Sequence, residues 1–362
     1  MESPSDRTES VSTVVITETS KFWRLANRVS SVRIALDVHG GDKAPEVNIA
    51  GASMALKQLP DDLFIEFVGK KDLISKLTAS HDLPSSRVSI VEAPGSFGMS
   101  EKPSTILRKK DTSLYRAAER VKEKEADALV SAGNTGAVLA VALFVVGRLR
   151  GVERGAIAVP VTSKNGFTVL LDCGANAEVR PEHLRDFAKM GYEYAKILGR
   201  SNPSIGLLSV GEEKEKGTAL TKEASALIAE ALGSAFVGNV EGRDVVYGDV
   251  DVIVSGGFEG NIALKSIEGV AKLVGDLLRK SIKEAGVFGL LGGLLLKGAF
   301  SRLKKTLNPS EYGGAFVLGV KGVVTKAHGS SDELAIMNAI RVAYEGVKGG
   351  LIDNLEGRFS KA

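Results

Sequence analysis

Short, predominantly apolar runs that alternate with helix-period segments constrain this chain more than any other feature. The runs are Arg33–Asp37, Phe64–Val68, Val88–Val91, Ala128–Ser131, Thr168–Asp172, Ile205–Ser209 and Val252–Ser255. Strands without an alternating polar face need cover on both sides, which a parallel sheet between two helical layers provides. The helical pattern is carried by Ser113–Glu125, Pro181–Leu198 and Lys216–Leu232. We therefore predict an α/β protein of three layers, α/β/α, with a mostly parallel sheet.

Composition narrows the class of protein further. The chain has 362 residues, of which 44% are hydrophobic and 25% charged, as in ordinary globular proteins. Its one cysteine excludes an internal disulfide, and its net charge of +3 is too small to indicate a nucleic-acid partner. No repeat or linker is evident. We predict a single domain over residues 32–362, preceded by a flexible extension, residues 1–31, that lacks a signal-peptide pattern.

One uncharged stretch, Ala128–Gly147, is long enough on paper to cross a membrane. Only its second half is continuously apolar, because Ser131–Gly136 reads Ser-Ala-Gly-Asn-Thr-Gly. We interpret it as a buried strand, a glycine turn and a buried helix.

Five of the predicted strands are followed by runs rich in Gly, Asp, Asn, Ser and Thr. These runs are Asp37–Asp42, Ser131–Gly136, Asp172–Asn176, Ser209–Glu213 and Ser255–Asn261. Ligands of open parallel sheets bind at the carboxyl ends of strands, where glycine permits close approach of the backbone. Five such loops along one sheet indicate a pocket for an oxyanion or a phosphate.

Several familiar chemistries have no motif in the sequence. The G-x-G-x-x-G fingerprint, the phosphate-binding P-loop and the G-x-S-x-G elbow are all missing. The four histidines are scattered, so we predict neither a metal site nor a cofactor. Cys173 follows a strand and is a candidate nucleophile, but a lone cysteine among apolar residues is usually packing. Direct attack by a bound substrate is the simpler mechanism.

These loops resemble those of a known family. Ile34–Asp37 with Gly40–Asp42, Ser131–Gly136, Gly211–Gly217, Gly238–Asp244, Gly257–Asn261, Glu311–Ala315 and Ala327–Ser331 are similar to motifs of the bacterial phosphate acyltransferases of the PlsX family. The resemblance implies a fold akin to isopropylmalate and isocitrate dehydrogenases and to phosphotransacetylase. It also implies attack of inorganic phosphate on the thioester of acyl carrier protein. The acyl phosphate formed would serve the acylation of glycerol 3-phosphate in phospholipid synthesis.

The resemblance implies roles for individual residues. Lys216 would hold phosphate or the developing charge, and Asn261 would donate to the acyl oxygen. The residues alone leave open a solvated Lys216 and an Asn261 that caps a helix beginning at Ile262. The residues expected to bind or orient phosphate are Asp37, Gly40, Gly41, Asp42, Gly133, Asn134, Thr135, Asp172, Gly174 and Asn176. Gly133, Asn134 and Thr135 would do so at the start of a helix that runs through Val146.

Residues 279–309 form a basic and apolar segment, which we predict to be a protruding helical hairpin. Its apolar centre, Val287–Leu296, is too short to span a bilayer but suits insertion into an anionic membrane surface. A buried hairpin and a docking site for the acidic carrier protein are the alternatives. The residues expected at this contact are Leu290, Leu291, Leu294, Leu295, Lys297, Arg302, Lys304 and Lys305.

The expected partners follow from the same resemblance: acyl carrier protein, inorganic phosphate, a second copy of the chain and the membrane glycerol 3-phosphate acyltransferase. The expected location is the cytoplasm, peripherally bound to the inner face of the membrane. Two other classes remain open. One is a phosphotransacetylase-like enzyme acting on acyl-CoA, and the other is a non-catalytic carrier-protein scaffold at the membrane.

Overall fold

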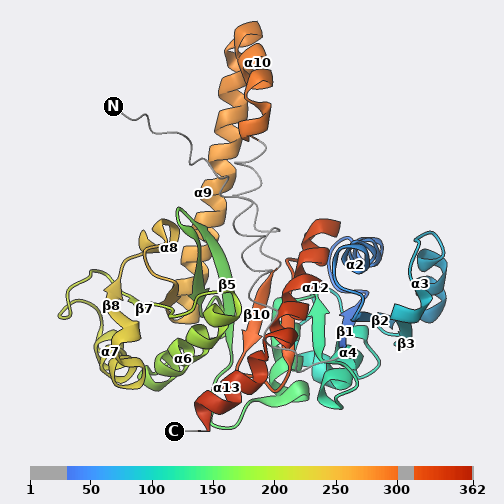
Figure 1. The fold of residues 1–362 in the computed structure, drawn as a ribbon, viewed down its shortest axis with the longest axis horizontal. Helices are drawn as coiled ribbons and strands as arrows, with labels where there is room; N and C mark the ends of the chain where they lie inside the picture. Colours follow the sequence, from blue (N-terminus) through green and yellow to red (C-terminus); the bar gives the residue numbers. More distant parts are fainter. Residues whose placement is uncertain (1–30, 301–313, 361–362) are drawn as a thin grey trace, which may run out of the picture.

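The computed structural model describes residues 31–300 and 314–360, and an 11-stranded sheet runs through its centre (Figure 1). The strands are β1 (Val32–Asp37), β2 (Leu63–Gly69), β3 (Val88–Glu92), β4 (Ala128–Ser131), β5 (Ala156–Ser163), β6 (Gly166–Leu171), β7 (Ile205–Leu208), β8 (Phe236–Val240), β9 (Val252–Val254), β10 (Ala315–Leu318) and β11 (Val323–Lys326). Their order is β3-β2-β1-β4-β11-β10-β5-β6-β9-β7-β8. All seven predicted strands are confirmed, and β5, β8, β10 and β11 are additional.

The sheet consists of two parallel halves that run in opposite directions. The pairs from β3 to β11 and those from β6 to β8 are parallel, whereas β11–β10, β10–β5 and β5–β6 are antiparallel. The mostly parallel sheet is confirmed, but the two sets of carboxyl ends point toward each other.

The register of β10 shows where the two sets of carboxyl ends meet. Lys326, which ends β11, pairs with Ala315 of β10. Two residues farther along β10, Val317 pairs with Ile157, whose N–H donates to the carboxylate of Asp172, just after β6. Two residues span about 7 Å along the strand, and three inter-strand spacings of about 4.8 Å separate β11 from β6 across the sheet. The loops that end the two halves therefore face each other at the middle of the sheet.

Helices cover both faces, which gives the predicted three layers. They are α2 (Glu46–Gln58), α3 (Lys71–Thr78), α4 (Ser113–Lys122), α5 (Thr135–Val141), α6 (Pro181–Ile197), α7 (Ala219–Leu232), α8 (Asp244–Tyr247), α9 (Gly257–Glu284), α10 (Gly286–Leu295), α12 (Glu333–Lys348) and α13 (Leu351–Phe359). One continuous core joins α2, α12, α13, α6 and α7 to one face. On the other face, α4 and α5 pack on the first half and α8 and α9 on the second.

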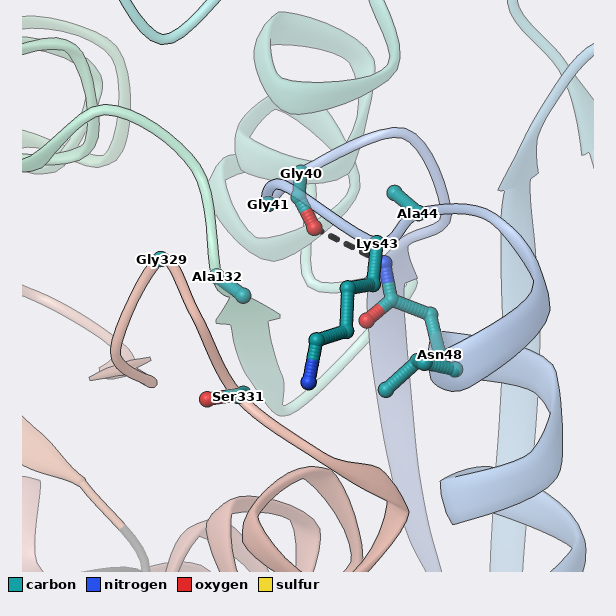
Figure 2. A pocket seen from close by; sticks show the side chains of 9 residues that line it. Gly40, Gly41, Lys43, Ala44, Asn48, Ala132, Gly329 and Ser331 are labelled. Carbon is teal, nitrogen blue, oxygen red and sulfur yellow. Dashed lines mark hydrogen bonds between the residues drawn. The ribbon is translucent and has the colours of Figure 1, made fainter.

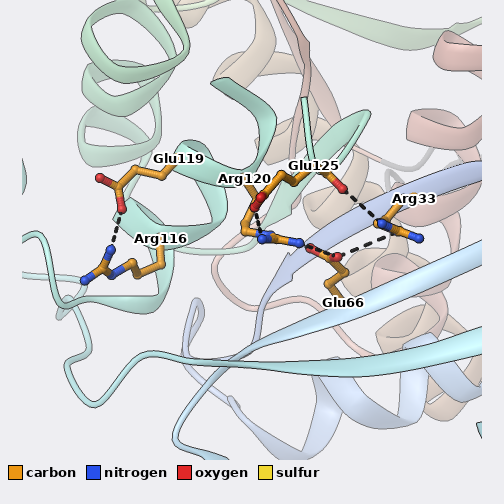
Figure 3. A network of polar contacts seen from close by, with 6 residues as sticks. All are labelled: Arg33, Glu66, Arg116, Glu119, Arg120 and Glu125. Carbon is orange, nitrogen blue, oxygen red and sulfur yellow. Dashed lines mark hydrogen bonds and ion pairs between the residues drawn. The ribbon is translucent and has the colours of Figure 1, made fainter. Parts of the chain in front are cut away.

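A charged network ties α4 to the first half of the sheet (Figure 3). The Glu66 carboxylate in β2, whose side chain is 4% exposed, accepts from Nε and Nη2 of Arg120 at 2.9 and 2.8 Å. Arg33 of β1 lies 3.7 Å from the same carboxylate. This forked pairing compensates a buried charge, and it raises the pKa of Arg120, with the hydrogen bond to Glu66 as the main cause.

Helix α9 leaves the body of the molecule and carries α10 at its far end, as Figure 1 shows. At 28 residues it is about 42 Å long. The chain turns at Gly286, whose φ is +63°, and α10 packs back on α9. A Cβ built at Gly289 would overlap the carbonyl oxygen of Ile282, so the two helices approach closely because α10 has glycine there. A protruding hairpin is therefore present, but it is formed by α9 and α10 and begins well before residue 279, whereas residues 301–309 of the predicted segment lie outside the described residues.

Among the described residues, no helix is both long enough and apolar enough to cross a membrane. Ala128–Gly147 folds as strand β4, helix α5 and a π-helical turn, Ala142–Gly147, within the domain. That interpretation of the uncharged stretch is therefore confirmed.

Candidate functional site

The loop after β1 is built around the buried carboxylate of Asp37, which is 2% exposed. Ser113 Oγ donates to its Oδ1 at 2.5 Å, and Ser131 Oγ to its Oδ2 at 2.7 Å. Ser131 in turn accepts from the N–H of Gly133 at 3.0 Å. Burial raises the pKa of Asp37 despite these hydrogen bonds. Asp37 thus joins the loops after β1 and β4 through hydrogen bonds within the protein.

Close approach of these two loops requires glycine. A Cβ built at Gly40 would lie 2.6 Å from Asp37 Oδ2 and 2.7 Å from the nitrogen of Gly133. Asn48 at the start of α2 fixes the turn, since its Nδ2 donates to the carbonyls of Val38 and Gly40 at 2.9 Å each. Gly40 is therefore structurally required whether or not its backbone binds a ligand.

A shallow hollow lies beside this turn (Figure 2). It is lined by Gly40, Gly41, Lys43, Ala44, Val47, Asn48, Ala132, Gly329 and Ser331. The side chain of Lys43 extends across the hollow, and Ser331 comes from the loop after β11. Ser331 is 7% exposed, and its Oγ has no hydrogen-bond partner among the described residues. The N–H of Asp42 donates to the carbonyl of Gly329 at 2.8 Å, which joins the two loops.

Asn134 caps helix α5. Its Oδ1 accepts from the N–H of Ala137 at 3.1 Å, and its Nδ2 donates to the carbonyls of Met99 and Glu101 at 2.7 and 3.3 Å. The side chain of Asn134 is thus fully engaged within the protein. Binding of phosphate by Gly133 or Thr135 stays a prediction. Because the N–H of Gly133 already donates to Ser131, such binding would use the N–H or the exposed hydroxyl of Thr135.

The loop after β6 has a second buried carboxylate, that of Asp172, which is 0% exposed. Its Oδ1 accepts from the N–H groups of Ile157 and Ala175 at 2.9 and 3.0 Å. Its Oδ2 accepts from the backbone and side-chain nitrogens of Asn176 at 2.8 and 2.9 Å. Burial is again the largest influence and raises the pKa of Asp172. Asp172 and Asn176 shape this loop from within.

Helix α9 begins against that loop. A Cβ built at Gly260 would overlap the carbonyl oxygen of Asp172, and one at Gly257 would lie 2.6 Å from Asp172 Oδ2. Ser255 exchanges backbone hydrogen bonds with Leu171 and Asp172 at 2.7 and 3.1 Å, so the segment before α9 is firmly held with Gly256 as its N-cap.

Asn261 lies in the first turns of α9. The helix begins at Gly257, so the alternative that Asn261 caps a helix beginning at Ile262 is wrong. Its side chain is exposed and lies beside Gly174, since a Cβ built there would be 3.5 Å from Asn261 Cγ. Gly174 has a φ of +111°, a conformation that favours glycine. An exposed amide next to this glycine turn is placed to donate to a ligand oxygen.

Lys216 is exposed on the loop that follows β7. A Cβ built at Gly211 would lie 3.1 Å from Lys216 Cγ, so the loop folds back on itself. The N–H of Lys216 donates to the carbonyl of Glu213 at 3.0 Å, but the described residues offer its ammonium no ion pair. Strands β6, β9 and β7 are adjacent and parallel, so Lys216, Asn261 and Asp172 share one edge of the sheet. Neither a hydrogen bond nor an ion pair joins the side chains of Lys216 and Asn261, both of which are described.

The surroundings of Cys173 do not favour a nucleophile. Cys173 is 7% exposed, its Sγ donates to the carbonyl of Leu170 at 3.3 Å, and burial raises the pKa of its thiol far above the ordinary range. The thiolate needed for attack is thus disfavoured. Within the described part of the chain, no three His, Cys, Asp or Glu side chains come together as a metal site would require.

Sequence reasoning missed a charged cluster where the two halves meet. Lys326 ends β11, and the charges of Lys265 and Glu268 on α9 and of Asp42 act on it. The same three charges act on His328, in the loop that follows β11. A single lysine after a strand matches no sequence motif. Its charged neighbours become visible only in the fold, where α9 packs across the junction of the two halves.

The hairpin exposes its apolar residues. The exposed fractions are 79% for Val287, 88% for Phe288, 54% for Leu291, 66% for Leu294 and 80% for Leu295. The alternative of a buried hairpin is therefore wrong in this chain. Lys297 is exposed as well, whereas Arg302, Lys304 and Lys305 lie outside the described residues.

Known proteins are similar to this chain over most of its length. The family model described as "Fatty acid synthesis protein" matches residues 32–354. The phosphate acyltransferase of Fervidobacterium nodosum is 51% identical over 330 residues, which cover 90% of this chain and 98% of that protein. The phosphate acyltransferase of Thermotoga maritima is 46% identical over 325 residues, covering 90% and 96%.

Solved structures with the same fold are more distant in sequence. A phosphotransacetylase from Streptococcus pyogenes superimposes with a TM-score of 0.62 at 16% identity, over 93% of this chain and 99% of that one. EutD phosphotransacetylase from Staphylococcus aureus gives 0.59 at 15%, over 90% and 98%. At such identities the likeness shows the fold alone.

Proposed function

This chain belongs to the fatty acid synthesis protein family and is an acyltransferase that uses phosphate as acceptor, and we propose that its acyl donor is acyl carrier protein. The acyl phosphate formed would serve the acylation of glycerol 3-phosphate in phospholipid synthesis. The observation that carries this is the pair of strand-end loop sets that converge at the middle of the sheet. The exposed side chains of Lys216 and Asn261 lie on one of these sets.

The mechanism needs no protein nucleophile. A phosphate oxygen attacks the thioester carbonyl, the new C–O bond forms, and the C–S bond breaks as the tetrahedral intermediate collapses. The carrier thiolate leaves and takes up a proton from solvent. Asn261 donates to the oxyanion through an uncharged amide, and Lys216 offsets negative charge, while Asp37 and Asp172 keep the loops in place.

The product decides between the candidate functions. The purified protein is incubated with phosphate and either long-chain acyl carrier protein or acyl-CoA, and acyl phosphate is trapped with hydroxylamine. Acyl phosphate from the carrier protein supports the proposal. Acyl phosphate from acyl-CoA alone supports a phosphotransacetylase-like enzyme, and none from either donor supports a scaffold.

Replacing Lys216 tests its assigned role. Lys216→Ala should lower turnover by roughly 100-fold, the loss expected for one electrostatic donor. Because Lys216 is exposed and makes no ion pair with any described residue, the melting temperature should not change. Lys214→Ala, two residues away in the same exposed loop, is the matched control. Near-wild-type turnover of Lys216→Ala would show that Lys216 does not stabilise charge in the reaction.

We further propose that the hairpin tip contacts an anionic membrane surface from the cytoplasmic side. The exposed Phe288, Leu291 and Leu295 and the basic flanks, among them Lys283 and Lys297, support this contact. The same surface is also suited to the carrier protein or to the membrane glycerol 3-phosphate acyltransferase. Excess lipid vesicles should displace either protein from it.

A homodimer is supported by an exposed apolar stripe in the middle of α9. Val270, Leu273, Val274 and Leu277 recur at helical spacing and are 49–59% exposed. A second copy would cover this stripe. Sedimentation of the wild type against Leu273→Glu tests it, and an unchanged mass for both would reject this interface.

A further inference from the structure

Lys326 occupies an unusual position at the junction of the two half-sheets. It ends β11, where it pairs with Ala315 on one side and with Ser131 on the other. Its side chain is partly buried, yet no carboxylate among the described residues lies within ion-pairing distance of its ammonium. Buried lysines are rare unless paired, because removing an ammonium from water is costly.

Another lysine of the same chain shows the ordinary solution. Lys348 of α12, 13% exposed, pairs with the carboxylate of Asp62. In the first half of the sheet, the buried Glu66 is likewise compensated by Arg120. Lys326 has no such direct partner, although the fold elsewhere supplies one. A partly buried cation without a direct ion-pair partner, at the carboxyl ends of the strands, points to an anion from outside the protein as that partner.

The charges around Lys326 point to the same conclusion. The groups that act on it are Lys265 and Glu268 from α9 and Asp42 from the loop after β1, and His328 stands two residues farther along its own loop. The carboxylate of Glu268 is already engaged by Lys265, at 2.6 Å. Burial, followed by the charge of Lys265, lowers the pKa of Lys326 to about 8. Two cations thus lie near each other where α9 crosses the junction.

Helix geometry connects this cluster to the proposed acyl site. Asn261, Lys265 and Glu268 are four and three residues apart, so they share one face of α9. That face lies toward Gly174 at Asn261 and toward Lys326 one turn later. An anion bound by Lys326 against α9 would therefore lie next to the amide expected to receive the acyl oxygen.

We propose that Lys326 binds the attacking phosphate at the junction of β11 and α9, a role that rests on the proposed function. The ammonium of Lys326 holds one phosphate oxygen and Lys265 adds positive potential. A second oxygen is thus left to attack the thioester beside Asn261. No bond to the lysine forms or breaks. Lys216, on the loop after β7, then stabilises the charge that develops on the acyl group.

The test compares Lys326→Met, Lys326→Arg and the matched control Lys321→Met, an exposed lysine at the other end of the β10–β11 hairpin. Lys326→Met should raise the KM for phosphate roughly tenfold or more, the effect of one charge-assisted hydrogen bond, and leave the KM for the acyl donor unchanged. Lys326→Arg should retain phosphate binding, and Lys321→Met should match the wild type.

Calorimetry with inorganic phosphate separates this inference from the proposed function, because it needs no acyl donor. Wild-type affinity should fall as the pH rises above about 8, where Lys326 loses its proton, and Lys326→Arg should keep its affinity at pH 9.

Lys326→Met should also melt at a higher temperature than the wild type at pH 7, because a buried charge has been removed. Equal phosphate affinity of Lys326→Met and wild type overturns the inference, as does a lower melting temperature with both KM values raised. Phosphate binding that depends on Lys326, without acyl phosphate from any donor, overturns the proposed function instead.

Discussion

Two regions of the molecule depart from the ordinary burial of side chains, in opposite directions. The carboxylate loops, residues 37–42 and 172–176, contain the buried charges of Asp37 and Asp172. The outer part of the α9–α10 hairpin, residues 270–295, exposes large apolar residues such as Phe288 and Leu295. Buried polar groups and exposed apolar groups are the informative exceptions to hydrophobic burial. In the carboxylate loops, hydrogen bonds from the protein compensate the buried carboxylates. In the hairpin, nothing in the described chain covers the exposed apolar side chains.

This difference separates structural from interaction roles. Every carboxylate oxygen of Asp172 accepts two hydrogen bonds from the protein, so nothing outside is needed. At the tip of the hairpin, α10 packs on α9 but leaves large apolar side chains exposed, and covering them needs an external partner. Mutations in the carboxylate loops should therefore act on folding, and mutations in the hairpin should act on association.

The largest expected effect is on the carboxylate loops, from Gly260→Ala. The added methyl group would overlap the carbonyl oxygen of Asp172, so the start of α9 must move and stability should fall by about 3 kcal/mol. Gly269→Ala lies in the same helix, where a Cβ meets nothing within 4 Å, and should gain up to about 1 kcal/mol. Urea unfolding of both variants measures the difference. Equal stability of the pair would show that α9 is not anchored on this loop.

The next effect concerns Asn261, which lies beside the carboxylate loops but is exposed. Asn261→Asp places a negative charge where the oxyanion is expected to form, and turnover should fall roughly 100-fold. Since the side chain has no cap role, stability should change by less than about 0.5 kcal/mol. Asn202→Asp, at an exposed position before β7, serves as the control. Turnover and a melting curve are measured together, and preserved turnover would reject the oxyanion role.

The carboxylate loops also show which features a sequence reveals. The seven strands were predictable because each is a local apolar run bounded by Gly, Asp or Ser. Strand β5 was not, since Pro160, Thr162 and Ser163 interrupt its apolar pattern. The reversal of the sheet depends on pairing of β10 with β5, residues more than 150 positions apart, which no local pattern encodes.

The start of α9 and the position of Lys326 were hidden for similar reasons. Gly256 and Gly257 indicate a turn by their residue type, but the sequence does not show that Gly257 must be small because the helix begins against Asp172 and Asn176. The charged neighbours of Lys326 lie on α9, more than 50 residues earlier in the chain, so no local pattern indicates them. The candidate loops were therefore predictable one by one, whereas their convergence was not.

A smaller effect separates charge from hydrogen bonding at Asp37. Burial raises its folded-state pKa above the ordinary value of 3.8, so the folded protein binds the proton more tightly than the unfolded chain. Stability from this group is fully present below pH 3.8 and is lost as the pH rises through the folded pKa. Asp37→Asn does not titrate. The stability of wild type minus that of Asp37→Asn should therefore decrease with rising pH and then level off.

Urea unfolding of both proteins between pH 4 and pH 8 measures that difference, since all other groups titrate in both. At neutral pH we expect it to be about 1 kcal/mol, the value of one hydrogen bond, because the amide cannot accept from Ser131 as the carboxylate does. A difference that grows with pH would contradict the raised pKa.

The smallest effect on folding, and the sharpest contrast with Gly260→Ala, is expected in the hairpin from the double change Leu291→Glu and Leu295→Glu. Both side chains are exposed, at 54% and 80%, so the melting temperature should not change. If the tip inserts into lipid, each leucine contributes about 1.5–3 kcal/mol of burial, and the variant should be released from anionic vesicles. Changing the same two residues to Gln removes apolar area without adding charge, so release of that variant as well assigns the binding to burial. Vesicle co-sedimentation beside a melting curve decides the matter: unchanged binding would end the membrane proposal, and a collapse of stability would place these leucines in a core.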